Sequence, residues 1–303
     1  MRDDQASLII DSSYIGYQAR YTMGDLSHDD LPTGVIFGFL SRILHLGLMF
    51  GTNDLSFCWD SRHSLRRDIY PDYKKKKKDR TQIEWDEIAL MKDQFKVLRK
   101  KILPMIGFNN HFIQPGYESD DIMASIVFTK LGDWILVTGD EDLFQCISNN
   151  TRVYSPSKKK MMTLKRFFEE KQITPGTWVR VKMTAGCKSD NVIGIEGVGE
   201  KKAIQFLNRQ MKPGKTLDKI NAGEKLIDSN RVLVELPFPG TKEPTFRPNI
   251  FSMKGFEKVC KHYGFHSFLQ PEHLEEWETF FKLHMTESPR SQYNKTRKKG
   301  MRS

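Results

Sequence analysis

The chain has 303 residues, with 48 Lys or Arg against 38 Asp or Glu, and a formal net charge of +10. Hydrophobic residues make up 38% and charged residues 28%, a balance that supports a folded core and excludes a wholly disordered chain. The most apolar stretch, 35–50, contains Ser41, Arg42 and His45, so we expect a buried helix there and no membrane span. No apolar leader is evident at the start. The absence of a Cys-x-x-Cys pair predicts a reducing, cytoplasmic location, with four scattered cysteines: Cys58, Cys146, Cys187 and Cys260.

Short apolar runs that lead into carboxylates predict buried strands. Three of these runs, at 7–10, 55–59 and 134–138, are rich in β-branched and aromatic residues, and a further strand is expected at 110–114. Strands that alternate with helices predict an α/β fold with a parallel sheet. The expected helices are 33–50, 85–105, 119–131 and 164–171.

Acidic residues follow three of these strands directly. Because sites form where the carboxyl ends of parallel strands meet, we expect Asp11, Asp60, Asp140 and Asp142 to lie close together. A single Asp at such a position is commonly a helix cap. Four at equivalent strand ends favour a shared site instead.

The segment Gly-Tyr-Glu-Ser-Asp-Asp at 116–121 places three acids in four residues at an expected helix N-terminus, where the helix dipole favours them. Oxygen ligands of this kind suit Mg²⁺ or Mn²⁺. Two such ions about 3.5–4 Å apart activate water and stabilise the leaving oxygen in phosphodiester cleavage. Taken singly, Asp120 or Asp121 is as well explained as a helix cap, and Asp190 as a turn residue. The candidate metal ligands are Asp11, Asp60, Glu118, Asp120, Asp121, Asp140, Asp142 and Asp190.

Positive charge is concentrated in two segments. Residues 62–80 hold nine Lys or Arg against three Asp, and residues 290–303 hold six with no acid, so each segment carries +6 and the rest of the chain −2. A concentrated basic strip indicates a polyanion partner, most often nucleic acid. The alternatives are a solvated lysine loop at 62–80 and a disordered tail at 290–303.

Beyond residue 175 the pattern changes to short helices. Gly194, Gly197 and Gly199 predict a tight turn whose backbone amides are exposed at a helix start. Later residues of zinc-binding type fit no strong ligand template, and the aromatic residues between them favour a packed helix. They are Cys260, His262, His266 and His273.

Six segments of the chain occur in the order found in one known family. They are 8–11, 59–60, 70–74, 116–121, 138–143 and 197–201. On these segments the chain resembles the flap endonuclease and 5′-to-3′ exonuclease family, which includes the 5′-nuclease part of bacterial DNA polymerase I. Residues 65–68 most resemble the ribonuclease H type of T-even bacteriophages. The resemblance covers residues 7–210.

The resemblance implies a PIN-like, or resolvase-like, parallel-sheet nuclease core at 1–180, with a helical arch at about 74–95. It implies a helical duplex-binding region at 181–289, containing a helix–three-turn–helix element and packed on the core. A basic, disordered tail is expected at 290–303. The implied activity is structure-specific, metal-dependent cleavage near 5′ ends of branched or nicked DNA, with removal of RNA primers during replication or repair.

The resemblance also implies roles for particular residues. Six acids match the family's metal site, Asp121 matches a position behind the ions, and Lys74 matches a lysine near the scissile phosphate. The implied catalytic residues are Lys74, Asp140 and Asp142. The implied nucleic-acid-binding residues are Arg66, Arg67, Tyr73, Lys74, Lys75, Lys76, Arg80, Gly197, Gly199, Lys201 and Lys202. The implied cofactors are two Mg²⁺ or Mn²⁺ ions and a K⁺ ion at the 194–203 turn. The expected partners are branched, nicked or primer-bearing DNA, RNA/DNA duplex, and a single-strand-binding protein or polymerase acting in trans, with the chain itself a monomer that binds no membrane.

Two departures from the family pattern affect these expectations. The family usually has Gly-Asp-x-x-Asp-Asn where this chain has Gly-Cys-Lys-Ser-Asp-Asn at 186–191, and the thiol of Cys187 is a poor Mg²⁺ ligand. Weaker Mg²⁺ binding, a Mn²⁺ preference or reduced endonuclease activity is expected, and a DNA-binding protein with impaired catalysis is the alternative function. A third hypothesis is an RNA-processing nuclease of PIN-like fold. Tyr14 is the second departure, because it stands where the family often has Asn.

Overall fold

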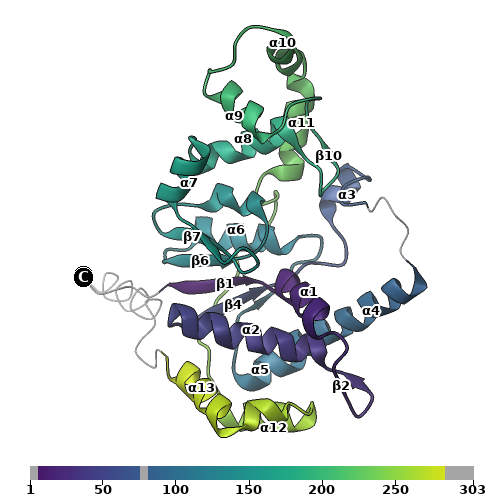
Figure 1. The fold of residues 1–303 in the computed structure, drawn as a ribbon, viewed down its shortest axis with the longest axis vertical. Helices are drawn as coiled ribbons and strands as arrows, with labels where there is room; N and C mark the ends of the chain where they lie inside the picture. The colour runs from purple at the N-terminus through teal and green to yellow at the C-terminus, as the bar shows by residue number, and fades with distance from the viewer. Residues whose placement is uncertain (1–5, 76–80, 284–303) are drawn as a thin grey trace, which may run out of the picture.

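A computed structural model describes residues 6–75 and 81–283. Its centre is a six-stranded sheet with the order β5-β4-β1-β6-β7-β8 (Figure 1). Neighbouring strands are parallel except for β8, which pairs antiparallel with β7. The parallel α/β prediction is therefore confirmed, as are the four expected strands. The strands of this sheet are β1 (Ser7–Asp11), β4 (Leu55–Cys58), β5 (His111–Phe112), β6 (Trp134–Val137), β7 (Thr151–Ser155) and β8 (Lys160–Met162).

Two small hairpins lie outside the main sheet. Each has two strands of two residues, paired antiparallel. They are β2 (Ser27–His28) with β3 (Leu31–Pro32), and β9 (Gly186–Cys187) with β10 (Val192–Ile193).

Helices connect the strands in the first part of the chain. All four predicted helices are present, with shifts of one to three residues at several ends. The helices are α1 (Ser12–Met23), α2 (Gly34–Phe50), α3 (Leu65–Ile69), α4 (Gln82–Val97), a π-helical turn (Leu98–Ile102), α5 (Leu103–Ile106), α6 (Ser119–Thr129), a 3₁₀ helix (Glu141–Cys146), α7 (Leu164–Lys171) and α8 (Pro175–Ala185).

Local signals explain where two of these helices begin and end. Helix α4 starts three residues before the expected position because Thr81 and Glu84 form a reciprocal capping box. Helix α2 ends at Gly51, whose φ of 61° lies in the left-handed region that glycine adopts without strain. The expected helix at 85–105 is continuous in direction but passes through the π-helical turn.

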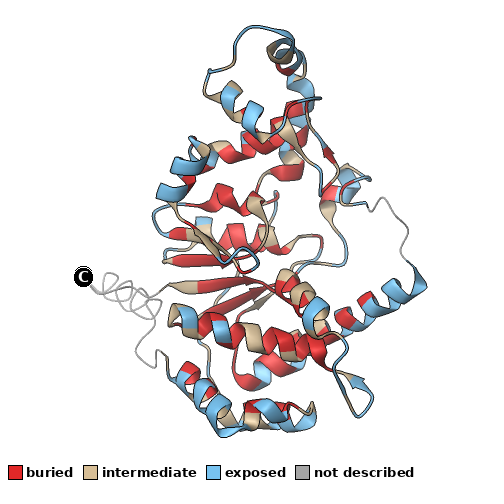
Figure 2. Cartoon of the chain, in the orientation of Figure 1, coloured by how far each residue is buried: buried red, intermediate tan, exposed pale blue. Residues whose placement is uncertain are grey.

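Side chains of the central strand alternate between two cores. Ile9 packs with residues of α6 to α8 on one face, whereas Leu8 and Ile10 pack with α2 and α5 on the other. In Figure 1 these two groups of helices lie above and below the sheet. Figure 2 shows buried residues along the sheet and on the helix faces turned toward it.

The C-terminal helices divide between the two cores. Helices α9 to α11 extend the core on the α8 side, through Ala203, Ile220 and Ile227. Helices α12 and α13 pack beneath the opposite face, through Phe256 and Trp277 (Figure 1). Their bounds are α9 (Glu200–Leu207), α10 (Lys215–Ala222), α11 (Glu224–Val234), α12 (Met253–His262), a 3₁₀ turn (His266–Leu269) and α13 (Pro271–Lys282).

The expected boundary at residue 180 falls inside α8, and the division into regions at 1–180 and 181–289 stays a prediction. Lys76, Arg80 and the tail at 290–303 lie outside the described residues. Within 6–75 and 81–283, none of the helices combines the length and the apolar character needed to cross a membrane.

Candidate metal centre and phosphate site

Acids at the ends of three neighbouring strands are joined by hydroxyl and amide groups. The Ser119 amide donates to Asp60 Oδ1 at 2.9 Å, and its hydroxyl donates to Asp11 Oδ1 at 3.2 Å. Thr138 Oγ1 donates to Asp11 Oδ2 at 3.0 Å and accepts from the Asp140 amide at 3.1 Å. The sheet edge therefore gathers these three acids as their positions in the sequence predict.

Asp120 and Asp142 complete this group of acids, and the negative charges of the group repel one another. The Asp142 amide donates to Asp140 Oδ1 at 2.7 Å. Oδ1 of Asp120 is buried without a hydrogen-bond partner. Burial, followed by the charges of Asp140 and Asp11, raises the pKa of Asp120 well above its usual value. Burial and the charge of Asp60 raise the pKa of Asp11 to about 7. An unpartnered buried oxygen among like charges fits a site for a divalent cation with oxygen ligands.

Mg²⁺ or Mn²⁺ is expected to raise the thermal unfolding temperature more at pH 8 than at pH 5.5. The folded-state pKa values of Asp11 and Asp142 are raised to about 7 and about 6, by burial first and then by neighbouring acids. These acids therefore favour the folded state when protonated, and that contribution is lost as the pH rises through the folded pKa values. A cation binds the deprotonated oxygens and restores stability in the same pH range. Thermal unfolding with EDTA or with the cation at each pH measures this, and an equal shift at both pH values would contradict it.

Glu118 is paired with Tyr73 and Lys74, the tyrosine and lysine at the start of the expected arch. Lys74 Nζ lies 2.8 Å from Glu118 Oε2, and the Tyr73 hydroxyl donates to the same oxygen at 3.1 Å. Burial opposes ionisation of Glu118, but the charges of Lys74 and Arg66 outweigh it and lower the pKa. Burial likewise opposes the charge on Lys74, yet Tyr73 and Glu118 raise its pKa well above the ordinary value. Lys74 is therefore held as a cation beside the acids.

Arg66 and Asp121 form a buried ion pair, which differs from the expected role of Arg66 in nucleic-acid binding and from direct cation ligation by Asp121. Their side chains make two parallel hydrogen bonds of 2.7 Å, and the whole residues are 2% and 0% exposed. Arg66 Nε also donates to the Leu233 carbonyl, and Asp121 Oδ1 accepts from the Phe238 amide. Arg66 is thus too buried to contact nucleic acid, and both carboxylate oxygens of Asp121 already accept hydrogen bonds. The pair joins α3 and α6 to the end of α11.

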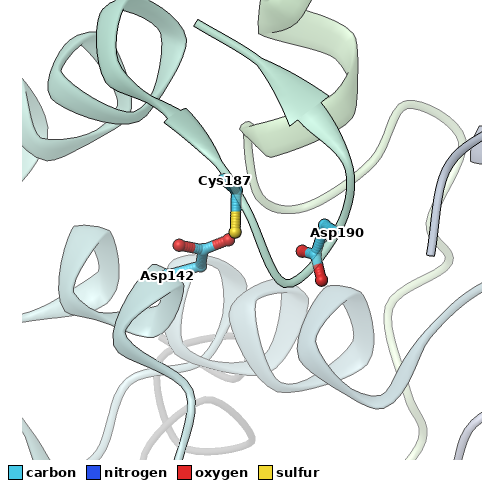
Figure 3. A group of neighbouring side chains, drawn as sticks. All are labelled: Asp142, Cys187 and Asp190. Atoms are coloured by element: carbon cyan, nitrogen blue, oxygen red, sulfur yellow. The ribbon is translucent and has the colours of Figure 1, made fainter. Parts of the chain in front are cut away.

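A second group of candidate ligands shares Asp142 with the first and adds Cys187 and Asp190 (Figure 3). Ligand atoms of Asp142, Cys187 and Asp190 all lie within 4.8 Å of one another, the only such group of three in the part of the chain that the structure describes. Asp142 follows β6, and the other two belong to the β9–β10 hairpin. Burial, followed by the charges of Asp190 and Asp142, raises the pKa of the Cys187 thiol to about 11. A bound cation would displace that proton.

The sequence did not indicate Lys182 as part of this centre. Its ammonium lies 3.1 Å from Asp142 Oδ1 and 3.1 Å from Glu200 Oε1, with the side chain 10% exposed. Ser119 and Thr138 were also missed as groups that orient acids, although both stand inside motifs that the sequence singles out. Lys182 carries no such signal, because it lies in α8 among apolar residues.

The glycine-rich turn lines a groove of about 990 Å³, together with residues before and at the start of the expected arch. Gly197 has a φ of 74°, which favours glycine, and the space where its side chain would stand is open. Lys202 Nζ donates to the Gly197 carbonyl at 2.8 Å, so this lysine holds the turn. The groove brings together three of the expected nucleic-acid-binding positions, Lys75, Gly197 and Gly199, with their neighbours. Its lining includes Tyr70, Asp72, Lys75, Lys188, Asn191, Gly197 and Gly199.

Tyr14 lies against the loop that carries Asp140. A Cβ atom on Gly139 would come within 2.5 Å of the Tyr14 ring, so the ring requires glycine at this position. The Tyr14 hydroxyl accepts from Gln18 Nε2 at 2.9 Å. Tyr14, which stands where the family often has Asn, therefore places an aromatic ring against the loop that carries Asp140.

The four residues of zinc-binding type do not form a ligand group. Cys260 is fully buried in the core beneath the sheet, while His266 packs against His28 and His273 pairs with Glu276. The structure therefore supports packed helices in this segment, as the aromatic residues between the four predicted.

Comparisons with known proteins identify similar chains. A family model described as the N-terminal resolvase-like domain of 5′-3′ exonucleases matches residues 6–172. A 5′-3′ exonuclease of Aquifex aeolicus is 30% identical over 206 residues, which cover 66% of this chain and 68% of that protein. A 5′-3′ exonuclease of Bacillus subtilis is 26% identical, covering 76% and 80%. The DNA polymerase I of Thermus thermophilus is 26% identical, but the match spans only 29% of its length.

Solved structures share the fold at lower identity. A T5 5′-exonuclease structure with bound divalent zinc ions aligns with a TM-score of 0.63 at 22% identity, covering 77% of this chain and 90% of that one. The flap endonuclease-1 of Methanococcus jannaschii aligns with a TM-score of 0.54 at 15% identity, covering 93% and 92%. These likenesses support the same fold for nearly the whole chain.

Proposed function

The chain belongs to the flap endonuclease and 5′-to-3′ exonuclease family, and from that premise we propose how its residues cleave phosphodiester bonds near 5′ ends. It is a structure-specific, metal-dependent 5′ nuclease of DNA replication or repair. The observation that carries the proposed site is the unpartnered buried oxygen of Asp120 among repelling acids, with the Lys74 ammonium beside them.

Two divalent cations, when bound, supply activation of water and stabilisation of the leaving oxygen. In our proposal one position is held by Asp11, Asp60, Glu118, Asp120 and Asp140, and the other by Asp142, Cys187 and Asp190. Lys74 binds the scissile phosphate and stabilises its developing charge. Glu118 holds the Lys74 ammonium, while Ser119 and Thr138 keep the acids oriented.

The thiol of Cys187 is proposed to shift cation preference from Mg²⁺ toward Mn²⁺. In Cys187→Asp, which restores an oxygen ligand, we expect Mg²⁺-supported cleavage to rise about tenfold relative to Mn²⁺-supported cleavage. Cys187→Ser is the matched control, because it removes the thiol without adding a carboxylate, and it should not gain Mg²⁺ activity. Titration with Co²⁺ gives a readout independent of cleavage.

Direct ligation by the thiolate should produce a near-ultraviolet sulfur-to-cobalt absorption in the wild type that is absent from Cys187→Ser. Two results would argue against this role of Cys187. One is a ratio of Mg²⁺-supported to Mn²⁺-supported cleavage that is unchanged in Cys187→Asp, and the other is a cobalt spectrum that is the same in Cys187→Ser as in the wild type.

We propose that the groove beside Gly197 and Gly199 binds duplex phosphates through backbone amides, with a K⁺ ion at the 194–203 turn. The exposed ammonium groups of Lys75 and Lys201 add sequence-independent attraction. Arg67 and Lys74 lie at the entrance to the proposed arch, and Lys202 supports the turn. Tyr73, expected to bind nucleic acid, is only 2% exposed and donates its hydroxyl to Glu118 instead. In this proposal 1–180 is the nuclease core and 181–289 is the main duplex-binding region, with Lys75 of the core lining the same groove.

The finer assignments are inferences from the family. We propose branched or nicked DNA and RNA-primed duplexes as substrates, with ribonuclease H activity on the latter. We further propose a bacteriophage-type enzyme that acts as a monomer in the host cytoplasm, with a polymerase or single-strand-binding protein in trans.

A test compares a 5′-labelled flap duplex with an RNA-primed duplex, each with Mg²⁺ and with Mn²⁺. Product lengths distinguish flap cleavage from stepwise exonuclease action. Release of oligonucleotides of flap length or of primer fragments is expected. Tight flap binding without cleavage in either cation would favour the second candidate function, a DNA-binding protein with impaired catalysis, for which Cys187 is the supporting observation.

A further inference from the structure

We propose that Asn191 is a positioning residue that holds the Lys74 turn, defined as residues 72–75, against the tip of the β9–β10 hairpin. The inference rests on the proposed function, because it concerns how Lys74 is placed beside the acids. In this arrangement, cation binding at the hairpin tip and correct placement of Lys74 support one another.

The Lys74 turn is held from two sides by side chains distant in sequence. Asn191 Nδ2 donates to the Asp72 carbonyl at 3.0 Å and to the Lys75 carbonyl at 2.5 Å. From the other side, Arg67 donates to the Tyr73 carbonyl at 3.1 Å and to the Lys74 carbonyl at 3.3 Å. All four consecutive carbonyls of the turn therefore accept a hydrogen bond from one of two side chains.

The backbone of the turn needs this support. Lys74 has a φ of 52°, a left-handed conformation that is unfavourable for a residue with a side chain. Such a conformation persists where the surroundings over-determine it. The Lys74 amide also donates to the Asp190 carbonyl at 2.8 Å, so the hairpin tip contacts the turn through two residues.

The same hairpin tip bears two of the three candidate ligands in the second cation group, Cys187 and Asp190. The tip is only a few residues long, since Cys187 pairs with Val192 across the hairpin. A cation that fixes the tip therefore also fixes the donors to the Lys74 turn. By linkage, ordering of the turn must favour cation binding by the same factor.

A double-mutant cycle tests whether Asn191 acts through Lys74. Asn191 itself has a φ of 58°, so Asn191→Gly removes the amide side chain while tolerating the backbone conformation. In this variant we expect kcat for flap cleavage to fall about tenfold with KM within about twofold. In a Lys74→Ala background the same change should cost less than about twofold, because the residue it positions is absent. Asn109→Gly is the matched control, since Asn109 Nδ2 also donates to a distant carbonyl, that of Pro248, away from the acids.

Wild-type kcat in Asn191→Gly, or an equal loss in both backgrounds, would overturn the proposal. So would a fall in kcat matched by Asn109→Gly, because that result would assign Asn191 a merely structural role.

Hydrogen exchange supplies a readout that needs no cleavage. Mn²⁺ should protect amides of both 187–192 and 72–75 in the wild type, and protection of 72–75 should be lost in Asn191→Gly. Protection of 187–192 alone in the wild type would overturn the coupling even if the enzyme cleaves. Coupled protection in a wild type that does not cleave would instead reject the proposed function and leave the coupling intact.

Discussion

Asp140→Asn is expected to abolish cleavage of a 5′-flap duplex while leaving duplex affinity within about twofold. Asp140 shares its carboxylate between the Asp142 amide and the proposed first cation position, so the amide replacement keeps the size of the side chain and removes one anionic ligand. A loss of at least about a thousandfold in rate is expected when a cation position that stabilises the transition state is impaired. Flap cleavage under single-turnover conditions and fluorescence anisotropy on the same duplex measure the two quantities.

The neighbouring residue supplies the control. Glu141 pairs with Lys158 at 2.6 Å and belongs to neither proposed cation position. Glu141→Gln should cleave at a rate close to that of the wild type. Retained cleavage in Asp140→Asn, or a collapse of duplex binding with it, would be inconsistent with a ligand role for Asp140.

Asp121→Asn is expected to lower the free energy of unfolding by about 3–5 kcal/mol, the cost of leaving one charge of a buried pair uncompensated. The substitution leaves the guanidinium of Arg66 buried against a neutral amide, with both charge-assisted hydrogen bonds weakened. Urea unfolding, with the two-state assumption checked by two spectroscopic probes, measures the change.

An exposed ion pair provides the comparison. Glu170 contacts Lys160 and Arg166 at the surface, and Glu170→Gln should cost less than about 1 kcal/mol. The double variant Arg66→Met with Asp121→Leu should recover much of the stability, since it removes both buried charges. A small effect of Asp121→Asn, equal to that of Glu170→Gln, would mean that the pair does not stabilise the junction of α3, α6 and α11.

The central strands were predictable because parallel strands buried on both faces have continuous apolar sequences. Residues 7–10 and 134–137 fit that description, and the acids that follow them lie together for the same topological reason. Strand β7 escaped prediction because Arg152 and Tyr154 interrupt its apolar pattern. Helix α1 was missed because the buried residues near its start include two serines, Ser12 and Ser13.

Charge in the basic segment was harder to interpret. Arg66 and Arg67 stand next to each other in a strip that predicts a polyanion partner, yet one is buried on Asp121 and the other binds backbone carbonyls. Their partners lie 55 and six residues away, so only the fold distinguishes them from phosphate-binding arginines. The same limit applies to Lys182, whose acidic partners come from the 3₁₀ helix after β6 and from α9.

The packing of α13 against α2 has a consequence for the order of events during synthesis. Asn53 donates to the carbonyls of Phe280 and Phe281, and the ring of Phe280 occupies the space beside Gly47. The lower core is therefore completed by side chains more than two hundred residues downstream of the helix they cover. Loop closure over that distance is slow, and these residues are among the last described ones to emerge from the ribosome. The face of α2 that packs against α13 must stay open for most of translation, which makes it a surface for a chaperone to bind until α13 is synthesised.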